Sequence, residues 1–162
     1  SYSFVLKSSF TLFYLICSSV FIPLLMNLSS PKAPFYLLLF YLSIWVNNSF
    51  AYLVGSRFGK TKLFPAISPK KSWEGYWGGT IATLVLVYFV ENNFLLFGAI
   101  WWVIGLLIPL FATLGDFIQS YFKRRAIVKD SGTLFPGHGG FYDRMDSVIY
   151  TAPFYYLLIK FI

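Results

Sequence analysis

The sequence predicts an all-α, polytopic integral membrane protein with about five transmembrane helices and two polar loops. Hydrophobic residues make up 57% of the 162 residues, and charged residues make up only 12%. A soluble domain carries about 25% charged residues. The few charges are gathered into two stretches, with long uncharged runs between them. So few charges cannot cover a surface that faces water, so a membrane protein is the first expectation.

A membrane-spanning helix needs about 20 mostly apolar residues. Five runs meet or approach this length, and we expect spans near residues 6–28, 35–55, 75–91 and 94–115 and from Ser147 to close to Lys160. Glu91 is the one ionisable residue expected close to a span. Proteins that move ions usually keep charges inside the membrane, so this distribution disfavours a transporter.

Two basic loops, 56–74 and 116–146, hold most of the charge. Both follow even-numbered spans, so they lie on the same side of the membrane, and their excess of Lys and Arg places that side in the cytoplasm. The net charge of +7 could also indicate nucleic-acid binding. We do not expect a nucleic acid as partner, because the cations lie in loops between apolar runs and not on an exposed helix face.

The stretch "GSRFGKT" resembles a phosphate-binding P-loop but lacks its spacing. The P-loop has four residues between its glycines, whereas three separate Gly55 from Gly59. We interpret the two glycines as a turn that leaves the membrane, with Arg57 and Lys60 at the level of the lipid headgroups.

The stretch "SPKKSWEGYWGG" predicts an anion site at the start of the third span. Ser68 suits an N-cap and Pro69 the first helical position. Lys70 and Lys71 would then lie in the first turn, where free amide groups also attract anions. The alternative is that both lysines only set the topology. Glu74 can pair with a lysine or assist a metal ion, and we favour pairing. The GxxxG pattern that follows is common by chance in spans.

Carboxylates predict a metal site in the second basic loop. Asp116 ends the fourth predicted span, and Asp143 and Asp146 are three residues apart. If a helix begins near Phe141, these last two share a face. Mg²⁺ commonly uses one or two protein carboxylates together with water and substrate phosphates. The alternative for each carboxylate is an ion pair with a nearby Lys or Arg.

Cations and a glycine-rich turn surround these carboxylates. Glycines let backbone amide groups approach a ligand closely, and the cations could neutralise phosphate charge. The candidates are Lys123, Arg124, Lys129, Asp130, Gly137, His138, Gly139, Gly140 and Arg144. For Asp130 and Arg144, structural and functional roles are both open. Carboxylates, cations and glycines together are typical of phosphoryl or nucleotidyl transfer.

The segment "SYFKRRAIVKDSGTLFPGHGGFYDRMDS" resembles the signature of the phosphatidate cytidylyltransferases, or CDP-diacylglycerol synthases. The stretches "AYLVGSRFGKTKL" and "ISPKKSWEG" resemble an upstream block of the same family. The match includes Ser120, Lys123, Arg124, Lys129, Asp130, Pro136, the triplet His138 to Gly140, Asp143, Arg144 and Asp146.

The resemblance implies an integral membrane enzyme that uses Mg²⁺ to join CTP and phosphatidic acid, giving CDP-diacylglycerol and pyrophosphate. It implies metal binding by Asp116, Asp143 and Asp146, with Lys129 as a further catalytic residue. The implied substrate-binding residues are Asn48, Ser68, Lys70, Lys71, Glu74, Ser120, Lys123, Arg124, Asp130, Gly137, His138, Gly139, Gly140 and Arg144. The lipid bilayer is an implied partner, and a homodimer is a further expectation.

Two features depart from the family pattern. Asn48 stands where the family usually has an Asp, which removes a formal charge. Family members also usually have more spans before this region, so we expect residues 1–162 to form a single membrane-embedded domain that lacks them. The alternatives are a CTP-dependent polyprenol kinase, a cytidylyltransferase for another lipid, and a catalytically inactive membrane paralogue.

Overall fold

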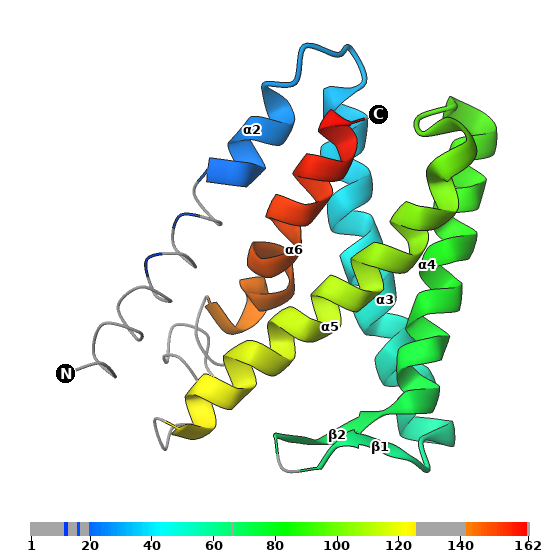
Figure 1. Cartoon of the computed structure of the whole chain (residues 1–162). Helices are drawn as coiled ribbons and strands as arrows, with labels where there is room; N and C mark the ends of the chain where they lie inside the picture. The colour runs from blue at the N-terminus through cyan, green and yellow to red at the C-terminus, as the bar shows by residue number, and fades with distance from the viewer. Residues whose placement is uncertain (1–11, 13–15, 17–19, 66, 126–141, 162) are drawn as a thin grey trace.

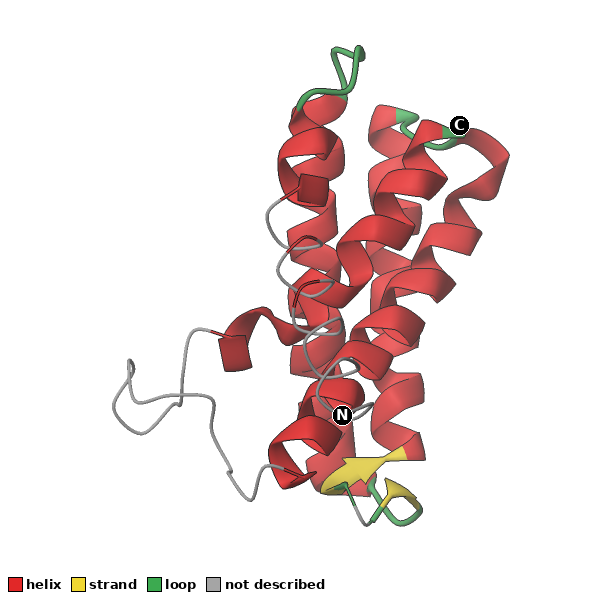
Figure 2. Ribbon diagram, turned by 60° about the vertical axis from the view of Figure 1, so that its left-hand side comes forward, coloured by secondary structure: helices red, strands yellow, loops and turns green. Residues whose placement is uncertain are grey.

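A computed structural model describes residues 12, 16, 20–65, 67–125 and 142–161, and of residues 142–144 it describes the backbone alone. Long helices lie side by side, and a small hairpin projects from one end of the bundle (Figures 1 and 2). In chain order the elements are α2 (Ile22–Met26), α3 (Ala33–Phe58), β1 (Lys62–Phe64), β2 (Ser68–Ser72), α4 (Trp73–Phe94), the 3₁₀ turn η2 (Gly98–Ile100), α5 (Trp101–Arg125) and α6 (Tyr142–Lys160).

The mostly helical architecture confirms the coarse fold prediction. Two helical segments, Ala33–Phe58 and Gly98–Arg125, are long and apolar enough to cross a membrane. They correspond to the second and fourth predicted spans. Helices α4 and α6 occupy the places of the third and fifth predicted spans. The first predicted span lies mostly outside the described residues, apart from its end in α2.

The fourth predicted helix was placed too early and made too short. Helix α5 begins at Trp101 and continues ten residues past Gly115, through Asp116 to Arg125. Residues 116–125 contain no Gly or Pro that would stop a helix, and three cations in the last turn complement the negative end of the helix dipole. Lys123 and Arg124 therefore lie on a helix and not in the second basic loop.

The prediction that Ser68 caps a helix was wrong. Residues Ser68–Ser72 form a strand that pairs antiparallel with β1. Ser72 is the N-cap instead, and its side chain accepts a hydrogen bond from the Gly75 N–H at 3.2 Å. The helix therefore begins at Trp73, which leaves the preceding residues free to pair with β1. Pro69 is tolerated because an edge strand does not need every N–H.

Helices α3 and α4 pack with their backbones in close approach. A Cβ atom at Gly79 would lie 2.6 Å from the Asn47 backbone oxygen and 2.6 Å from its Oδ1. A Cβ atom at Gly75 would lie 2.6 Å from the Ala51 backbone oxygen. The GxxxG pattern, which could have arisen by chance, therefore serves close packing, as small residues commonly do between membrane helices.

The exterior of the bundle is apolar, and several small polar residues are buried beside its hydrophobic core. Small polar residues are buried, including Ser43, Thr80, Thr83 and Thr151. Thr83 and Thr151 satisfy their hydroxyl groups by donating to the carbonyl oxygen four residues earlier. Large apolar residues are exposed along the outer side of α4, namely Trp77, Ile81, Val85 and Phe89. An apolar exterior of this extent fits a surface that contacts lipid.

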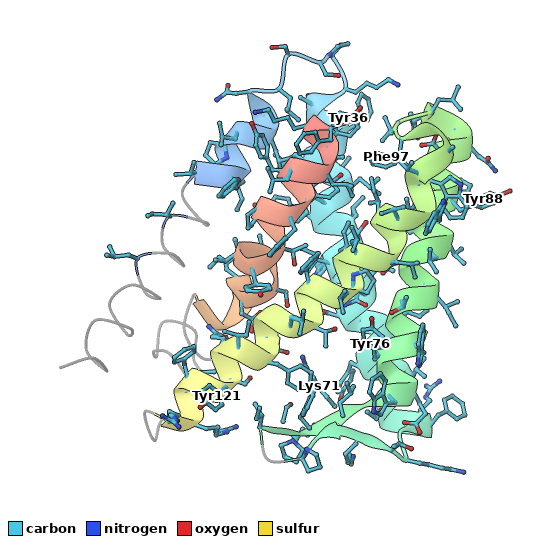
Figure 3. The ribbon with its side chains drawn as sticks, in the orientation of Figure 1. Tyr36, Lys71, Tyr76, Tyr88, Phe97 and Tyr121 are labelled. Atoms are coloured by element: carbon cyan, nitrogen blue, oxygen red, sulfur yellow. The ribbon has the colours of Figure 1, made fainter. Side chains whose placement is uncertain are left out.

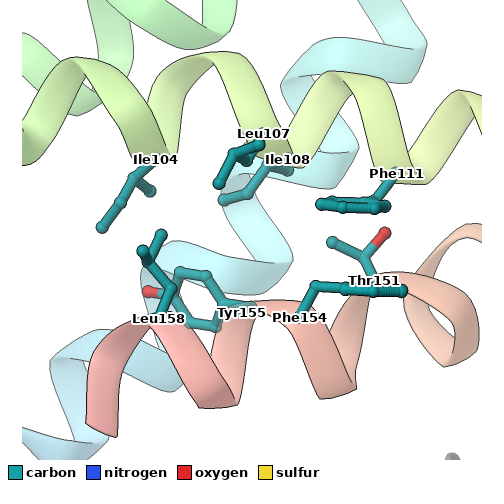
Figure 4. A pocket seen from close by; sticks show the side chains of 8 residues that line it. All are labelled: Ile104, Leu107, Ile108, Phe111, Thr151, Phe154, Tyr155 and Leu158. Atoms are coloured by element: carbon teal, nitrogen blue, oxygen red, sulfur yellow. The ribbon is translucent and has the colours of Figure 1, made fainter. Parts of the chain in front are cut away.

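Helices α5 and α6 pack through aromatic side chains and leave little empty space. The rings of Phe111 and Phe154 stack with centroids 3.9 Å apart. The void between the helices is about 10 Å³ and is lined mainly by aliphatic and aromatic side chains (Figure 4). It is too small to bind a ligand. Tyr155 is buried beside it and donates a hydrogen bond to the Tyr36 backbone oxygen at 3.0 Å.

Glu91 has a structural role at the end of the bundle opposite the hairpin. Its side chain is 6% exposed, and its two carboxylate oxygens accept hydrogen bonds from the N–H groups of Phe97 and Gly98 at 2.7 and 2.8 Å. Lys32 and Tyr36 donate to backbone oxygens of the same connection. This acid therefore closes the connection between α4 and α5.

We predict that Gly79→Ala destabilises the protein. In an open helical position this change would add up to about 1 kcal/mol of stability, but here the added methyl group meets the Asn47 carbonyl oxygen. We expect a net loss of about 1–3 kcal/mol, measured as a lower midpoint of thermal unfolding in detergent. Gly55→Ala should cost less, because the nearest atoms to its Cβ atom are the Ser72 Oγ at 3.2 Å and the Gly75 Cα at 3.4 Å. An unchanged or raised midpoint for Gly79→Ala would contradict the packing account.

Candidate active site

A large open pocket lies at the end of the bundle that carries the hairpin. Its volume is about 890 Å³, within the range of about 300–1,000 Å³ usual for small-molecule sites. The walls come from α3, both strands of the hairpin, the start of α4, α5 and the start of α6. Segments far apart in the sequence therefore meet here. Among the charged residues in its lining are Lys62, Lys70, Lys71, Asp116, Lys123 and Asp146.

An ion pair between Lys71 and Asp116 joins the hairpin to α5. Figure 3 shows Lys71 between these two elements. The ammonium group also lies 4.6 Å from the centre of the Phe117 ring, and Phe64 packs edge-on against the same ring at 5.1 Å. Asp116 accepts a further hydrogen bond from the Ser120 hydroxyl at 3.1 Å. The side chains of Lys71 and Asp116 are only 29% and 32% exposed, so solvent screens the pair in part.

Asp146 lies beside this pair and is more deeply buried, at 8% exposed. Close packing of α6 on α5 brings it there, since a Cβ atom at Gly115 would lie 2.9 Å from the Asp146 backbone oxygen. One carboxylate oxygen accepts hydrogen bonds from the Ser147 N–H at 2.6 Å and from its hydroxyl at 3.2 Å. Asp146 precedes the apolar run of α6, so it lies at the edge of the predicted span.

Burial and the neighbouring Asp116 carboxylate raise the pKa of Asp146 to about 7. Hydrogen bonds from Ser147 and the charge of Lys71 oppose the shift but do not cancel it. Two carboxylates held this close resist being charged together. A bound cation would relieve that repulsion, so the pair is suited to a divalent metal ion.

Among the described residues, Glu74 pairs with no lysine side chain, contrary to the expectation. Its carboxylate accepts hydrogen bonds from the backbone N–H groups of Lys60 and Thr61 at 3.1 to 3.3 Å. Hydrogen bonding, first from its own backbone and then from Thr61 and Lys60, holds the pKa of Glu74 below its ordinary value. Glu74 is absent from the pocket lining, and its role here is to tie the end of α3 to the start of α4.

Several predicted residues meet in the pocket, and others lie nearby or elsewhere. Asn48 lines the pocket from α3, together with Lys70, Lys71, Asp116, Lys123 and Asp146. Ser120 is held against Asp116, and Ser68 begins β2 without lining the pocket. Arg124 is exposed on the last turn of α5. The start of α6 at Tyr142 confirms the helix expected near Phe141.

The rest of the predicted glycine-rich site lies outside the described residues. These positions are Lys129, Asp130, Gly137, His138, Gly139 and Gly140. The structure describes the backbone of Asp143 and Arg144 in α6 but not their side chains. Their predicted roles stay predictions.

Some lining residues were missed by the sequence analysis, among them Trp45, Asn47, Tyr52, Lys62, Tyr76, Thr113 and Ser147. Asn47 is 2% exposed and donates to the Asn48 Oδ1 at 3.2 Å. Its own Oδ1 has no hydrogen-bond partner among the described residues. A polar residue inside an apolar run is itself a signal of function or packing, and that signal was available at Asn47.

The described residues can supply part of a magnesium site. Asp116 and Asp146 offer carboxylate oxygens from two helices, which are the ligands that Mg²⁺ prefers. Within the described ranges, no three His, Cys, Asp or Glu residues gather as a metal cluster. Two carboxylates are nevertheless enough where substrate phosphates and water complete the coordination. Asp116 and Asp146 are therefore suited to binding Mg²⁺.

The chain belongs to the cytidylyltransferase family, which its sequence matches over residues 3–162. It is 39% identical over 158 residues to a phosphatidate cytidylyltransferase of Aquifex aeolicus (strain VF5), covering 94% of this chain and 56% of that protein. It is 42% identical over 130 residues to the protein of that name from Staphylococcus aureus (strain COL), covering 76% and 48%. The chain thus spans about half the length of these curated relatives.

We predict that Asp146→Asn stabilises the metal-free protein at neutral pH. The folded state holds the Asp146 proton more tightly than the unfolded chain, whose pKa is near 3.8. The stabilising contribution of protonated Asp146 is therefore lost as the pH rises from about 4 to about 7. The side chain of the asparagine variant does not titrate, so the variant does not lose this contribution. Its free energy of unfolding should exceed that of the wild-type protein by at most a few kcal/mol above pH 7, and the difference should shrink toward pH 4. Thermal unfolding with a metal chelator measures it.

Glu74→Gln provides a control of opposite sign. The pKa of Glu74 is lowered in the folded protein, so its contribution is present above the unfolded value of 4.5 and is lost as the pH falls. This variant should be less stable than wild type at neutral pH. If Asp146→Asn followed the pH dependence of the wild-type protein, the assigned environment of Asp146 would be wrong.

Proposed function

We propose that the full-length protein transfers the cytidylyl group of CTP to phosphatidic acid, giving CDP-diacylglycerol and pyrophosphate. An oxygen of the lipid phosphate attacks the α-phosphorus of CTP, and the bond from that phosphorus to the leaving pyrophosphate breaks. The similarity to phosphatidate cytidylyltransferases supports this reaction. The observation that carries the proposal is the convergence of Lys71, Asp116 and Asp146 in one large pocket at the end of the apolar bundle.

The cations of the pocket would hold the phosphate groups of both substrates. Lys70 and Lys71 come from the hairpin and Lys123 comes from α5, so they border the pocket from two sides. CTP carries several negative charges, and transfer of its α-phosphorus requires that they be neutralised. The ion pair with Asp116 holds the Lys71 ammonium group near both carboxylates.

The carboxylates Asp116 and Asp146, together with Asp143, would bind Mg²⁺. When bound, the ion would screen the charge of the nucleotide phosphates and of the leaving pyrophosphate. The arrangement of Asp116 and Asp146 across two packed helices keeps both oxygen donors on one pocket wall. Asn48, in the position of the usual Asp, would contribute an amide hydrogen bond in place of a charge.

The proposal also covers the membrane topology, the residues before and at the start of α6, and the oligomeric state. Five spans would place both basic segments on the cytoplasmic side, where CTP is available, and a lipid substrate could reach the same depth from the bilayer. Lys129 would take part in catalysis, and the further substrate-binding residues would be Asp130, Gly137, His138, Gly139, Gly140 and Arg144. A homodimer in the membrane is part of the expectation.

The decisive experiment is an assay of the full-length protein with CTP, Mg²⁺ and phosphatidic acid. We expect release of pyrophosphate and formation of CDP-diacylglycerol. Asp116→Asn should lower the rate at least 100-fold, since the loss of a positioned catalytic charge typically costs this much. Lys160→Gln removes a charge from the opposite end of α6 and should keep the wild-type rate.

The products separate the alternatives. Release of CDP with phosphorylation of a polyprenol would identify a kinase and overturn the proposal. Pyrophosphate release with a different lipid acceptor, but none with phosphatidic acid, would keep the chemistry and change the substrate. A folded protein that yields neither product would identify an inactive paralogue.

A further inference from the structure

We propose that the hairpin β1–β2 and the adjoining end of α3 form a binding surface for the headgroups of anionic phospholipids. We call it the basic surface and define it by Arg57, Lys60, Lys62 and Lys70, all of which are exposed. The inference goes beyond the transfer reaction, because lipid binding here does not require catalysis.

The charge of the basic surface is not balanced locally. Residues 56–73 contain no Asp or Glu. The first acid that follows, Glu74, directs its carboxylate to the backbone N–H groups of Lys60 and Thr61. In the part of the chain that the structure describes, no ion pair joins any of the four cations to an acid; Asp116 pairs instead with Lys71. The basic surface therefore stays net positive, because its four cations outnumber the one nearby carboxylate, that of Glu74.

The position of the basic surface points to a membrane. Helix α3 is long and apolar enough to span a bilayer, and Arg57 and Lys60 lie at its end. The hairpin continues from that end (Figure 1). Exposed aromatic side chains accompany the cations, with Phe58 65% exposed and Trp73 44% exposed. Aromatic rings next to cations are typical of the membrane–water interface.

This combination favours a lipid headgroup as the occupant. The long Lys and Arg side chains can lay their apolar stems along the lipid and extend their charges to the phosphates. Each cation close to an anionic leaflet strengthens the attraction by about fivefold. Lys62 and Lys70 also line the pocket, so the basic surface would gather anionic lipids beside the pocket mouth.

The test uses the full-length protein and the double variant Arg57→Gln/Lys60→Gln. Neither side chain lines the pocket, and the Lys60 contact with Glu74 uses its backbone N–H, so the fold should be unchanged. Native mass spectrometry would count bound phosphatidylglycerol against phosphatidylcholine from mixed micelles. We expect the wild-type protein to prefer phosphatidylglycerol and the double variant to lose about 25-fold of that preference, about fivefold for each cation removed.

The matched control is Lys160→Gln, which removes one exposed cation at the other end of the bundle. It should keep the wild-type preference. Equal binding of the two lipids by the wild-type protein, or an unchanged preference in the double variant, would overturn the proposal. So would displacement of the lipid by inorganic phosphate at an ionic strength where chloride has no effect, because the surface would then be a site for free phosphate. The count of bound lipid does not depend on catalysis. It therefore tests this proposal even if the protein releases no pyrophosphate.

Discussion

The ion pair between Lys71 and Asp116 is the contact on which the organisation of the polar end depends. It joins the only sheet in the described residues to α5, and Asp146 of α6 lies close enough to feel both charges. Three segments that are distant in sequence are therefore fixed around one centre of charge. An ion pair with each partner about 30% exposed adds little stability by itself, so its main effect is to position the groups.

The remainder of the structure keeps this centre at one end of an apolar bundle. Large hydrophobic side chains cover the outside, and close approaches at Gly75, Gly79 and Gly115 hold the helices together. Such contacts need small residues, because between lipid-exposed helices packing replaces the hydrophobic effect as the source of association. The same contact at Gly115 brings α6 onto α5 and buries Asp146. Helix packing therefore perturbs the acid that the proposed reaction would use.

The helices could be predicted because uncharged runs of this length have few other solutions in a membrane protein. The hairpin could not, since Ser68 and Ser72 are equally good caps by type and only the contact with Gly75 decides between them. The meeting of Asp116 with Asp146 was anticipated from chemistry. The hydrogen-bond partners of Glu74 could not be predicted, because they are backbone N–H groups, which every residue except proline has.

The central claim is that Asp116 and Asp146 act together as a divalent-cation site, and binding of Mn²⁺, a paramagnetic substitute for Mg²⁺, tests it most directly. Electron paramagnetic resonance would compare the wild-type protein with Asp116→Asn, Asp146→Asn and the double variant, each in the presence of CTP. The account predicts that either single change weakens Mn²⁺ binding at least tenfold and that the double variant is little worse, as expected for groups that share one ligand. Wild-type affinity in both single variants would contradict it.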